Sequence, residues 1–284
     1  MRLLTNLAKR AGRTLLLLFF AAAGTILLVR FAPGFFSDER EMDAKYAVAA
    51  QAELQQESSQ RSAGRIAMQM AKSWFSGDLG ISRQYQIPVA QLLSARVRVS
   101  ASLLAQGILR GWLVALCAAL PISALRKGAA FWRLPFTLLL AIPTAAMGTA
   151  CILADAGGPV LVLTLLIAAR EFNFLRGLLE AAWRSPHLIQ GRAQGMSARV
   201  LVTLHILPNV APQLCALATL SIVTALGALV PIEVIFNVPG VGQLAWSAVM
   251  NRDLPVLVAV SLLMACVVGF AGMLTTRDVT LEAA

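Results

Sequence analysis

A few ionisable side chains interrupt or border the long apolar runs of this chain, and they are the first candidates for chemistry. Arg110 falls inside an apolar run, where an arginine is costly and usually faces a cavity or a partner. It could line a translocation path and attract a substrate carboxylate, or it could extend to the outer membrane interface. Glu233 and Asp253 border later runs. They could attract a cationic substrate or an external receptor, or they could be solvated span ends or helix caps.

The sequence offers no motif for catalysis. It lacks H-E-x-x-H, G-x-S-x-G, a P-loop and any paired carboxylates inside the apolar runs. His187 and His205 lie eighteen positions apart without companion ligands, so we expect no metal site. The chain is therefore expected to be non-catalytic and to need no cofactor.

A polar and basic island at residues 185–208 has its own helix signals. Ser185 is a good N-cap, and Pro186 fits the first helical position. Gly195 sits where a helix of about nine residues needs a left-handed residue at its end. Ser197 can cap a second helix that leads to Pro208, which would open the next apolar segment. A helix, a glycine break and a second helix indicate a docking element, with Leu188 and Met196 as candidate apolar plugs.

The elements that position these residues are membrane spans. The 284 residues are 58% hydrophobic and only 13% charged, far from the quarter that is usual in soluble domains. Apolar runs predict an all-α polytopic membrane protein with about six spans. The spans are expected at residues 14–29, 99–124, 134–154, from 160 onwards, 210–232 and 254–276. The fourth run becomes charged from Arg170 onwards, where we expect it to leave the bilayer.

This pattern divides the chain into four predicted regions. They are an N-terminal tail with the first span (1–30), an extracytoplasmic loop (31–98), a core of five spans (99–276) and a cytoplasmic tail (277–284). The first run resembles a signal peptide, but an uncleaved span fits better because further spans follow. The region 233–253 forms a second outer loop, broken by Pro239, Gly240 and Gly242.

The distribution of charge predicts the orientation. The net charge is +10, and Lys and Arg gather in the N-terminal tail, the 126–133 turn and the 184–199 island. Helical membrane proteins concentrate these residues in their cytoplasmic loops, so nucleic acid is not an expected partner. Both termini and the 185–208 island are therefore predicted to be cytoplasmic, while the 31–98 and 233–253 loops face outward.

Several blocks together resemble the permease subunits of dipeptide, oligopeptide and nickel ABC importers. They occur in the family's order between Gly77 and Val256 and are G-D-L-G-I-S from Gly77, R-A-Q-G-M-S from Arg192, H-I-L-P-N from His205, E-V-I-F from Glu233, P-G-V-G from Pro239 and R-D-L-P-V from Arg252. One departure stands out: Ile189, Gln190 and Gly191 occupy the places of the family's E-A-A, and Gln194 replaces a customary Lys.

The resemblance implies a type I ABC importer fold and a coupling role for one set of residues, beside the path or gate candidates that come from the residues themselves. The set implied for coupling to ATPases is Ser185, His187, Leu188, Arg192, Ala193, Gln194, Gly195, Met196 and Ser197. The candidate path or gate residues are Arg110, Glu233, Pro239, Gly240, Gly242 and Asp253. The Pro239–Gly242 turn is either a gate or a plain hairpin, and the resemblance favours the gate.

The implied function is that of a membrane-spanning permease subunit in an ATP-driven importer of peptides or similar small solutes. The resemblance implies a second homologous permease, two cytoplasmic ATP-binding subunits and an extracytoplasmic solute-binding protein as partners in a bacterial inner membrane. An ATP-independent secondary transporter or channel subunit is the alternative, but it predicts inverted repeats and ionisable residues at the bilayer midplane. An intramembrane enzyme would need a catalytic pair at depth.

Overall fold

The protein is all-α in the part that the computed structural model describes, which is residues 12, 16, 20, 24, 79–124, 129–251 and 253–275. These residues contain no strand beyond one isolated bridge between Ile81 and Pro88. The helices are α4 (Val89–Ala124), α5 (Ala129–Ala141), α6 (Thr144–Leu153), α7 (Pro159–Trp183), α8 (Pro186–Ala193), α9 (Ala198–Val200), the π-helix η2 (Leu201–Ile206), α10 (Leu207–Ile235), α11 (Val241–Met250) and α12 (Leu254–Thr275). The predicted fold class is confirmed. The predicted first span, most of the 31–98 loop and the C-terminal tail lie outside the described residues.

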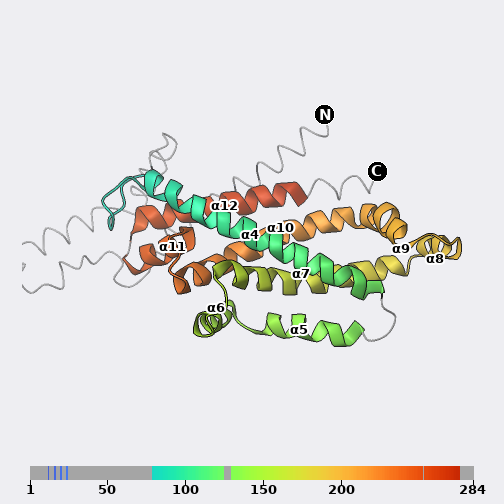
Figure 1. Cartoon of the computed structure of the whole chain (residues 1–284). Helices are drawn as coiled ribbons and strands as arrows, with labels where there is room; N and C mark the ends of the chain where they lie inside the picture. The colour runs from blue at the N-terminus through green and yellow to red at the C-terminus, as the bar shows by residue number, and fades with distance from the viewer. Residues whose placement is uncertain are drawn as a thin grey trace, which may run out of the picture. The chain divides into compact units, whose positions relative to one another are not determined.

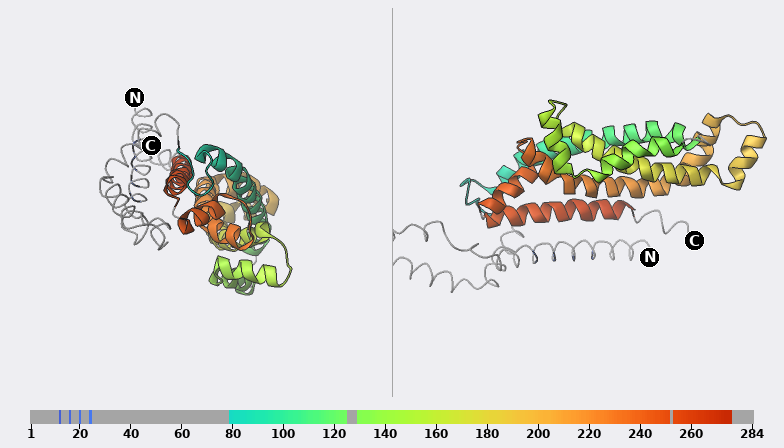
Figure 2. Two further views of the ribbon diagram at one scale, coloured as in Figure 1. Left: turned by 90° about the vertical axis from the view of Figure 1, so that its left-hand side faces the viewer. Right: turned by 90° about the horizontal axis from the view of Figure 1, so that it is seen from below.

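The described residues divide into two compact units. The first contains residues 79–96 and 244–267, and the second contains residues 97–243 and 268–275. In the second unit, α5, α6 and α10 all pack against α7 (Figure 1). The segment α8–α9 lies at one end of α7 and α10, and α6 lies at the other end (Figures 1 and 2).

Helix α4 packs closely on α7 through two glycines. A Cβ added to Gly107 would lie 2.5 Å from the Leu163 side chain, and one added to Gly111 would lie 2.7 Å from Ile167. Both distances are too short for real atoms, so the two helices approach only because these positions lack side chains. This G-x-x-x-G spacing is a common device for helix contact in membranes. The helix also begins at Val89, ten residues before the predicted span, because Arg96 and Arg98 hide its start in the sequence.

The third predicted span, residues 134–154, is not one straight helix. It consists of α5 and α6, which meet at an angle of 101°. Pro143 stands at the break and is the N-cap of α6, with an extended backbone (φ −58°, ψ 141°). Proline lacks the N–H that would continue the helix, and the residue before it avoids the helical conformation. Helix α5 alone is about 20 Å long at about 1.5 Å per residue, shorter than the apolar core of a bilayer.

Helix α7 continues beyond the point where its charges begin, at which the sequence predicts that the fourth run leaves the bilayer. It continues for 25 residues to Trp183, and Glu171 and Arg176 are buried within the second unit. Arg176 pairs with Glu180 one turn further on, at 2.5 Å. The charged stretch is thus part of the packed helix.

The helix that begins after Ser197 runs without a break into the fifth span. Helices α9, η2 and α10 together form one apolar helix, Ala198–Ile235. Pro208 opens the next apolar segment as its sequence predicts, since it lies in the first turn of α10. The π turn Leu201–Ile206 comes directly before it, where the missing N–H of Pro208 interrupts the hydrogen-bond ladder.

Three of the described helices are long and apolar enough to cross a membrane: Val89–Ser123, Ala198–Ile235 and Leu254–Gly272. A fourth results if the bent α5–α6 pair counts as one span. Helix α7 is also long enough, but Arg170, Glu171 and Arg176 interrupt its apolar sequence. The described residues therefore carry a polytopic helical membrane protein.

Candidate functional site

The loop at the α8 end has the helix, break and helix arrangement that its sequence predicts. Pro186 opens α8 after an extended Ser185, and α8 ends at Ala193 with Gln194 as its C-cap. Gly195 has a left-handed backbone, with φ of 81°. The Ser197 side chain accepts a hydrogen bond from Val200 N at 3.4 Å and so caps the next helix. Ser185, however, caps with its backbone only, since its hydroxyl donates to Ala182 O at 2.6 Å.

Helix α8 is held in the core by one face and presents the other. Leu188 is 1% exposed and packs in the apolar core with Leu201 and Ile206. Its neighbour Ile189 is 58% exposed, and Met196 is 39% exposed. The prediction of Leu188 as an outward apolar plug is therefore wrong, because Leu188 faces the neighbouring helices. Ile189 and Met196 are the large exposed apolar side chains of residues 185–197.

One tryptophan connects α8 with two long helices. Trp183, the last residue of α7, is 8% exposed. The guanidinium carbon of Arg192 in α8 lies 4.3 Å from the centre of the Trp183 ring. The indole N–H donates to the Ser123 hydroxyl near the end of α4, at 3.2 Å. Three helices thus meet at this side chain.

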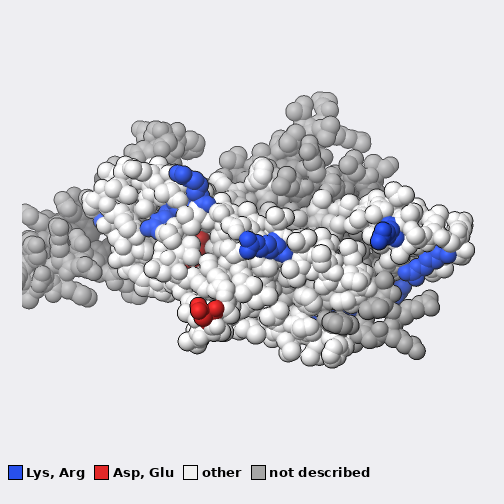
Figure 3. Space-filling view, viewed as in Figure 1, with Lys and Arg blue, Asp and Glu red and all other residues white. Residues whose placement is uncertain are grey.

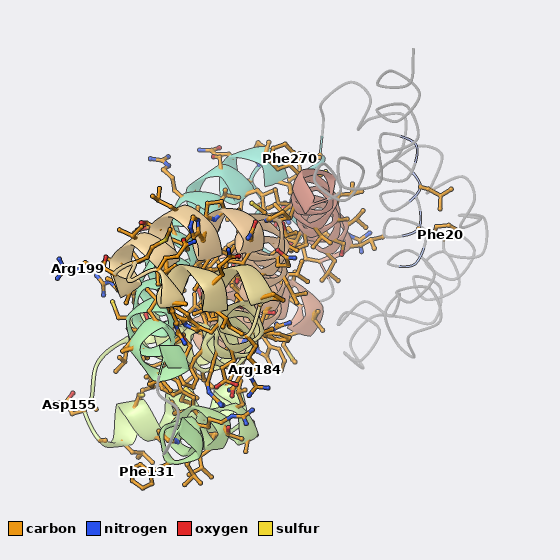
Figure 4. All side chains as sticks on the ribbon, turned by 90° about the vertical axis from the view of Figure 1, so that its right-hand side faces the viewer. Phe20, Phe131, Asp155, Arg184, Arg199 and Phe270 are labelled. Carbon is orange, nitrogen blue, oxygen red and sulfur yellow. The ribbon has the colours of Figure 1, made fainter. Side chains whose placement is uncertain are left out.

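Basic side chains surround this end of the second unit. Arg184, Arg192 and Arg199 are all exposed. Figure 3 shows basic groups over the α8–α9 end and an acidic group near α6. Figure 4 looks onto the α8–α9 end and shows Arg199 extending outward from it. His187 also lies in α8. The surface offered here is basic, and its exposed apolar side chains include Ile189, Met196 and Val200.

The two ends of the second unit collect the segments that the charge pattern assigns to opposite sides. The Trp183–Ser123 hydrogen bond brings the C-terminal ends of α7 and α4 together, and both were predicted to be cytoplasmic. A bond between Ser100 and Glu233, at 2.6 Å, joins the early part of α4 to the end of α10. Both of those segments were predicted to face outward. The geometry is therefore consistent with the predicted alternation of spans.

Glu233 is a buried helix cap. Its carboxyl group is 0% exposed. One oxygen accepts from Gly242 N at 2.7 Å and from Gln243 N at 3.1 Å, and the other accepts from the Ser100 hydroxyl. The Ser100 hydroxyl in turn accepts from Val241 N at 2.7 Å. The first N–H groups of α11, which have no partner within their own helix, are thus satisfied by α4 and α10.

The glycines of the Pro239–Gly242 turn are required by this cap. A Cβ added to Gly240 would overlap the Glu233 carboxyl group, and one added to Gly242 would lie 2.8 Å from the Val230 backbone. Of the readings given to Glu233 by its sequence, the helix cap is the one that the structure supports, although the side chain is buried rather than solvated. Neither Glu233 nor this turn presents a charge on the described surface.

Asp253 holds the first unit in a similar way. It is 0% exposed and accepts from the Ser82 hydroxyl at 2.5 Å and from Gln84 N at 3.2 Å. Tyr85 and Gln84 also contact Ser247, so the turn before α4 is attached to α11. The second carboxyl oxygen of Asp253 has no hydrogen-bond partner among the described residues. The blocks that begin at Gly77 and Arg252 thus meet around one buried carboxyl group.

Arg110 lies on the exposed side of α4, between the two packed glycines in sequence. Its guanidinium donates to Gln106 one turn earlier, at 3.3 Å. A groove runs along α7 and α10 on the same unit. Its lining is mostly apolar, with two amide side chains, and consists of Asn173, Phe174, Gly177, Leu178, Gln213, Ala216, Leu217 and Leu220. The structure does not place Arg110 among these residues.

Several residues that organise the site were missed by sequence reasoning. The Trp112 N–H donates to the Ser221 hydroxyl at 2.9 Å, and that hydroxyl contacts buried Glu171 at 2.9 Å, which links α4, α10 and α7. Serines inside apolar runs give no signal of their partners. The G-x-x-x-G spacing of Gly107 and Gly111 was a readable signal that was overlooked.

Comparison with known proteins agrees with this geometry. A family model described as the binding-protein-dependent transport system inner membrane component matches residues 107–277, more than half of the chain. The metal-staphylopine import system permease protein CntB of Staphylococcus aureus is 34% identical over 107 residues, which are 38% of this chain and 34% of that protein. A Brucella ovis protein named as a peptide permease is 32% identical over 111 residues, 39% of this chain and 35% of its own. A Sinorhizobium fredii protein named as a peptide ABC transporter permease is 28% identical over 105 residues, 37% of this chain and 34% of its own. The matches thus span about a third of the length of these relatives.

Proposed function

Because this chain belongs to the family of binding-protein-dependent transport system inner membrane components, we propose that it is the membrane-spanning permease subunit of an ATP-driven importer. The observation that carries the proposal is the packing of α8 and its flanking residues. Leu188 fixes this short polar helix in the apolar core, while Ile189, Met196 and three arginines of the helix and its flanks are exposed. An element of this kind can be moved by a partner and can pass the movement to the helices that hold it.

The partners follow from the need for an energy source. The sequence contains no P-loop, so nucleotide binds to separate ATP-binding subunits that contact the α8 end. A homologous permease supplies the other half of the translocation path, and a solute-binding protein delivers the solute from outside. The groove along α7 and α10 is the surface that we assign to this chain's half of the path. Its amides, Asn173 and Gln213, offer polar groups in an otherwise apolar wall.

The proposed solutes are peptides or similar small molecules. Two of the relatives carry names that assign them to peptide transport, and the third is named for metal-staphylopine import. The proposed setting is a bacterial inner membrane, with both termini and the α8 loop on the cytoplasmic side. The concentration of arginine around α8 supports that orientation.

An ATP-independent transporter is the competing function, and one observation favours it. Glu171 is buried in α7 beside the Ser221 hydroxyl, and secondary transporters use ionisable groups at such depth. That function predicts solute movement by this chain in vesicles without nucleotide. The importer predicts none, so nucleotide dependence separates the two functions.

The test is co-expression of this chain with the proteins encoded beside its gene. The importer predicts that ATP-binding subunits co-purify with it. Ile189→Asp places a charge on the exposed face of α8. It is expected to reduce recovery of those subunits about tenfold or more, because apolar contacts worth about 1–2 kcal/mol at the interface between α8 and the ATP-binding subunit are lost. Leu153→Asp, at an 83% exposed position at the other end of the second unit, is the matched control and leaves recovery unchanged. Solute transport by this chain alone, without nucleotide, would overturn the proposal.

A further inference from the structure

Helix α4 has no direct chain connection to α8, although the two meet through side chains. Helix α7 leads into α8 through Arg184 and Ser185, and η2 follows α9 directly. These two helices therefore receive any displacement of α8 through the backbone. For α4, the contact must be made by side chains, and Trp183 lies at that point.

The contacts around Trp183 are directional. On one side, the Arg192 guanidinium lies 4.3 Å from the ring centre, within the range of a cation–π interaction. At the ring edge, the indole N–H donates to Ser123, whose own hydroxyl is fixed by donation to Leu120 O at 2.8 Å. Both the ring and Ser123 are buried, so neither side chain has free space into which it could turn. A shift of Arg192 therefore moves the ring, and the ring moves the end of α4.

We propose that Arg192, Trp183 and Ser123 form the joint that transmits displacement of α8 to α4. This inference rests on the proposed function, since it concerns movement imposed on α8 by ATP-binding subunits. The three are positioning residues: none of them contacts nucleotide or solute in the proposal. Without the joint, α7 and α10 still follow α8, but α4 is then coupled to α7 only further along that helix, at Gly107 and Gly111, and its end near α8 is no longer held there.

Loss of the joint is expected to reduce transport, while the packing around α8 keeps the complex assembled. Leu188, Leu201 and Ile206 hold α8 and η2 in the core, and none of these three contacts depends on the Trp183 N–H. Trp183→Phe alters the joint without changing the exposed side chains Ile189, Arg192 and Met196. Loss of the joint is therefore expected to leave the ATP-binding subunits attached.

The experiment compares Trp183→Phe with Trp112→Phe in the full complex, reconstituted with its ATP-binding subunits and solute-binding protein. Both changes remove one indole N–H that donates to a serine hydroxyl between helices, Ser123 in one case and Ser221 in the other. Only Trp183 also contacts α8. The readout is the number of solute molecules transported per ATP hydrolysed, measured beside the recovery of the ATP-binding subunits.

We expect Trp183→Phe to lower that ratio about fivefold, the equivalent of one hydrogen bond of about 1 kcal/mol. Arg192→Gln should lower it similarly, and Arg192→Lys should restore most of it because the cation returns. Trp112→Phe should change it less than twofold. An equal fall in the transport ratio in both tryptophan variants would contradict the proposed joint, because it would show that any lost hydrogen bond between the helices has the same effect. An unchanged ratio with Trp183→Phe would do the same. Failure of the wild-type chain to bind ATP-binding subunits would instead contradict the proposed function.

Discussion

Replacement of Glu233 tests whether the start of α11 depends on a buried cap. In Glu233→Ala, Gly242 N and Gln243 N lose their acceptor, and the Ser100 hydroxyl loses one partner. Gly242 is buried and Gln243 half-buried, so neither amide is fully reached by water. The variant is therefore expected to destabilise the fold and to release the start of α11.

The magnitude follows from the number of lost bonds. A buried donor without a partner costs about 1–3 kcal/mol, which gives about 2–6 kcal/mol for the two amides. Removal of the carboxyl group also removes the cost of burying it, which offsets part of that loss. We expect a net loss of about 2 kcal/mol, or a fall in the melting temperature of roughly 4–8 °C for a chain of this size.

The assay heats purified protein in detergent and measures the fraction that stays monodisperse on size-exclusion chromatography. Glu233→Gln is the matched control because it keeps one oxygen that can accept from both amides, and its amide can donate to Ser100. It should lose about 1 kcal/mol or less. The capping role is contradicted if Glu233→Ala has the same melting temperature as the wild type, or if Glu233→Gln is as unstable as Glu233→Ala.

Two further predictions concern glycines. Gly111→Ala puts a Cβ 2.7 Å from Ile167 and should lower stability by about 1–3 kcal/mol in the same melting assay. Its control is Gly177→Ala in α7, where an added Cβ meets nothing within 4 Å, and this variant should be neutral or slightly stabilising. Equal effects of the two variants would contradict the close packing of α4 on α7. Gly195→Val, at φ of 81°, should strain the break after α8 by about 1–2 kcal/mol and lower transport per ATP hydrolysed without unfolding the spans, while Gly195→Asn should be milder. An unchanged ratio with the valine variant would argue against a role for this break in coupling.

The sequence predicted the class and the loop but not its contacts. Proline, glycine and serine act locally, so the start of α8 at Pro186, the left-handed Gly195 and the Ser197 cap were all readable. Leu188 and Ile189 are adjacent apolar residues of similar size. Only the packing of α8 on η2 decides which one is buried, and that depends on residues distant in the sequence.

Burial of charge was the second limit. Charged residues lower the apolarity of a run, so the sequence predicts that the fourth run leaves the bilayer from Arg170 onwards. In the structure, α7 continues because Ser221 of α10 donates to Glu171 and Glu180 pairs with Arg176. Glu233 and Asp253 were misjudged as surface groups for the same reason, since Ser100 and Ser82 lie more than a hundred residues away from their partners.

The central claim is that the exposed face of α8 docks on an ATP-binding subunit. The most direct measurement places a photo-reactive amino acid at Ile189 or at Leu153 and co-expresses each variant with the ATP-binding proteins encoded beside this gene. Ile189 is exposed on α8, and Leu153 is exposed on α6, which lies at the opposite end of the same unit (Figure 1). Our account predicts a covalent adduct with an ATP-binding subunit from position 189 and none from position 153. An adduct from position 153 with none from position 189 would contradict it.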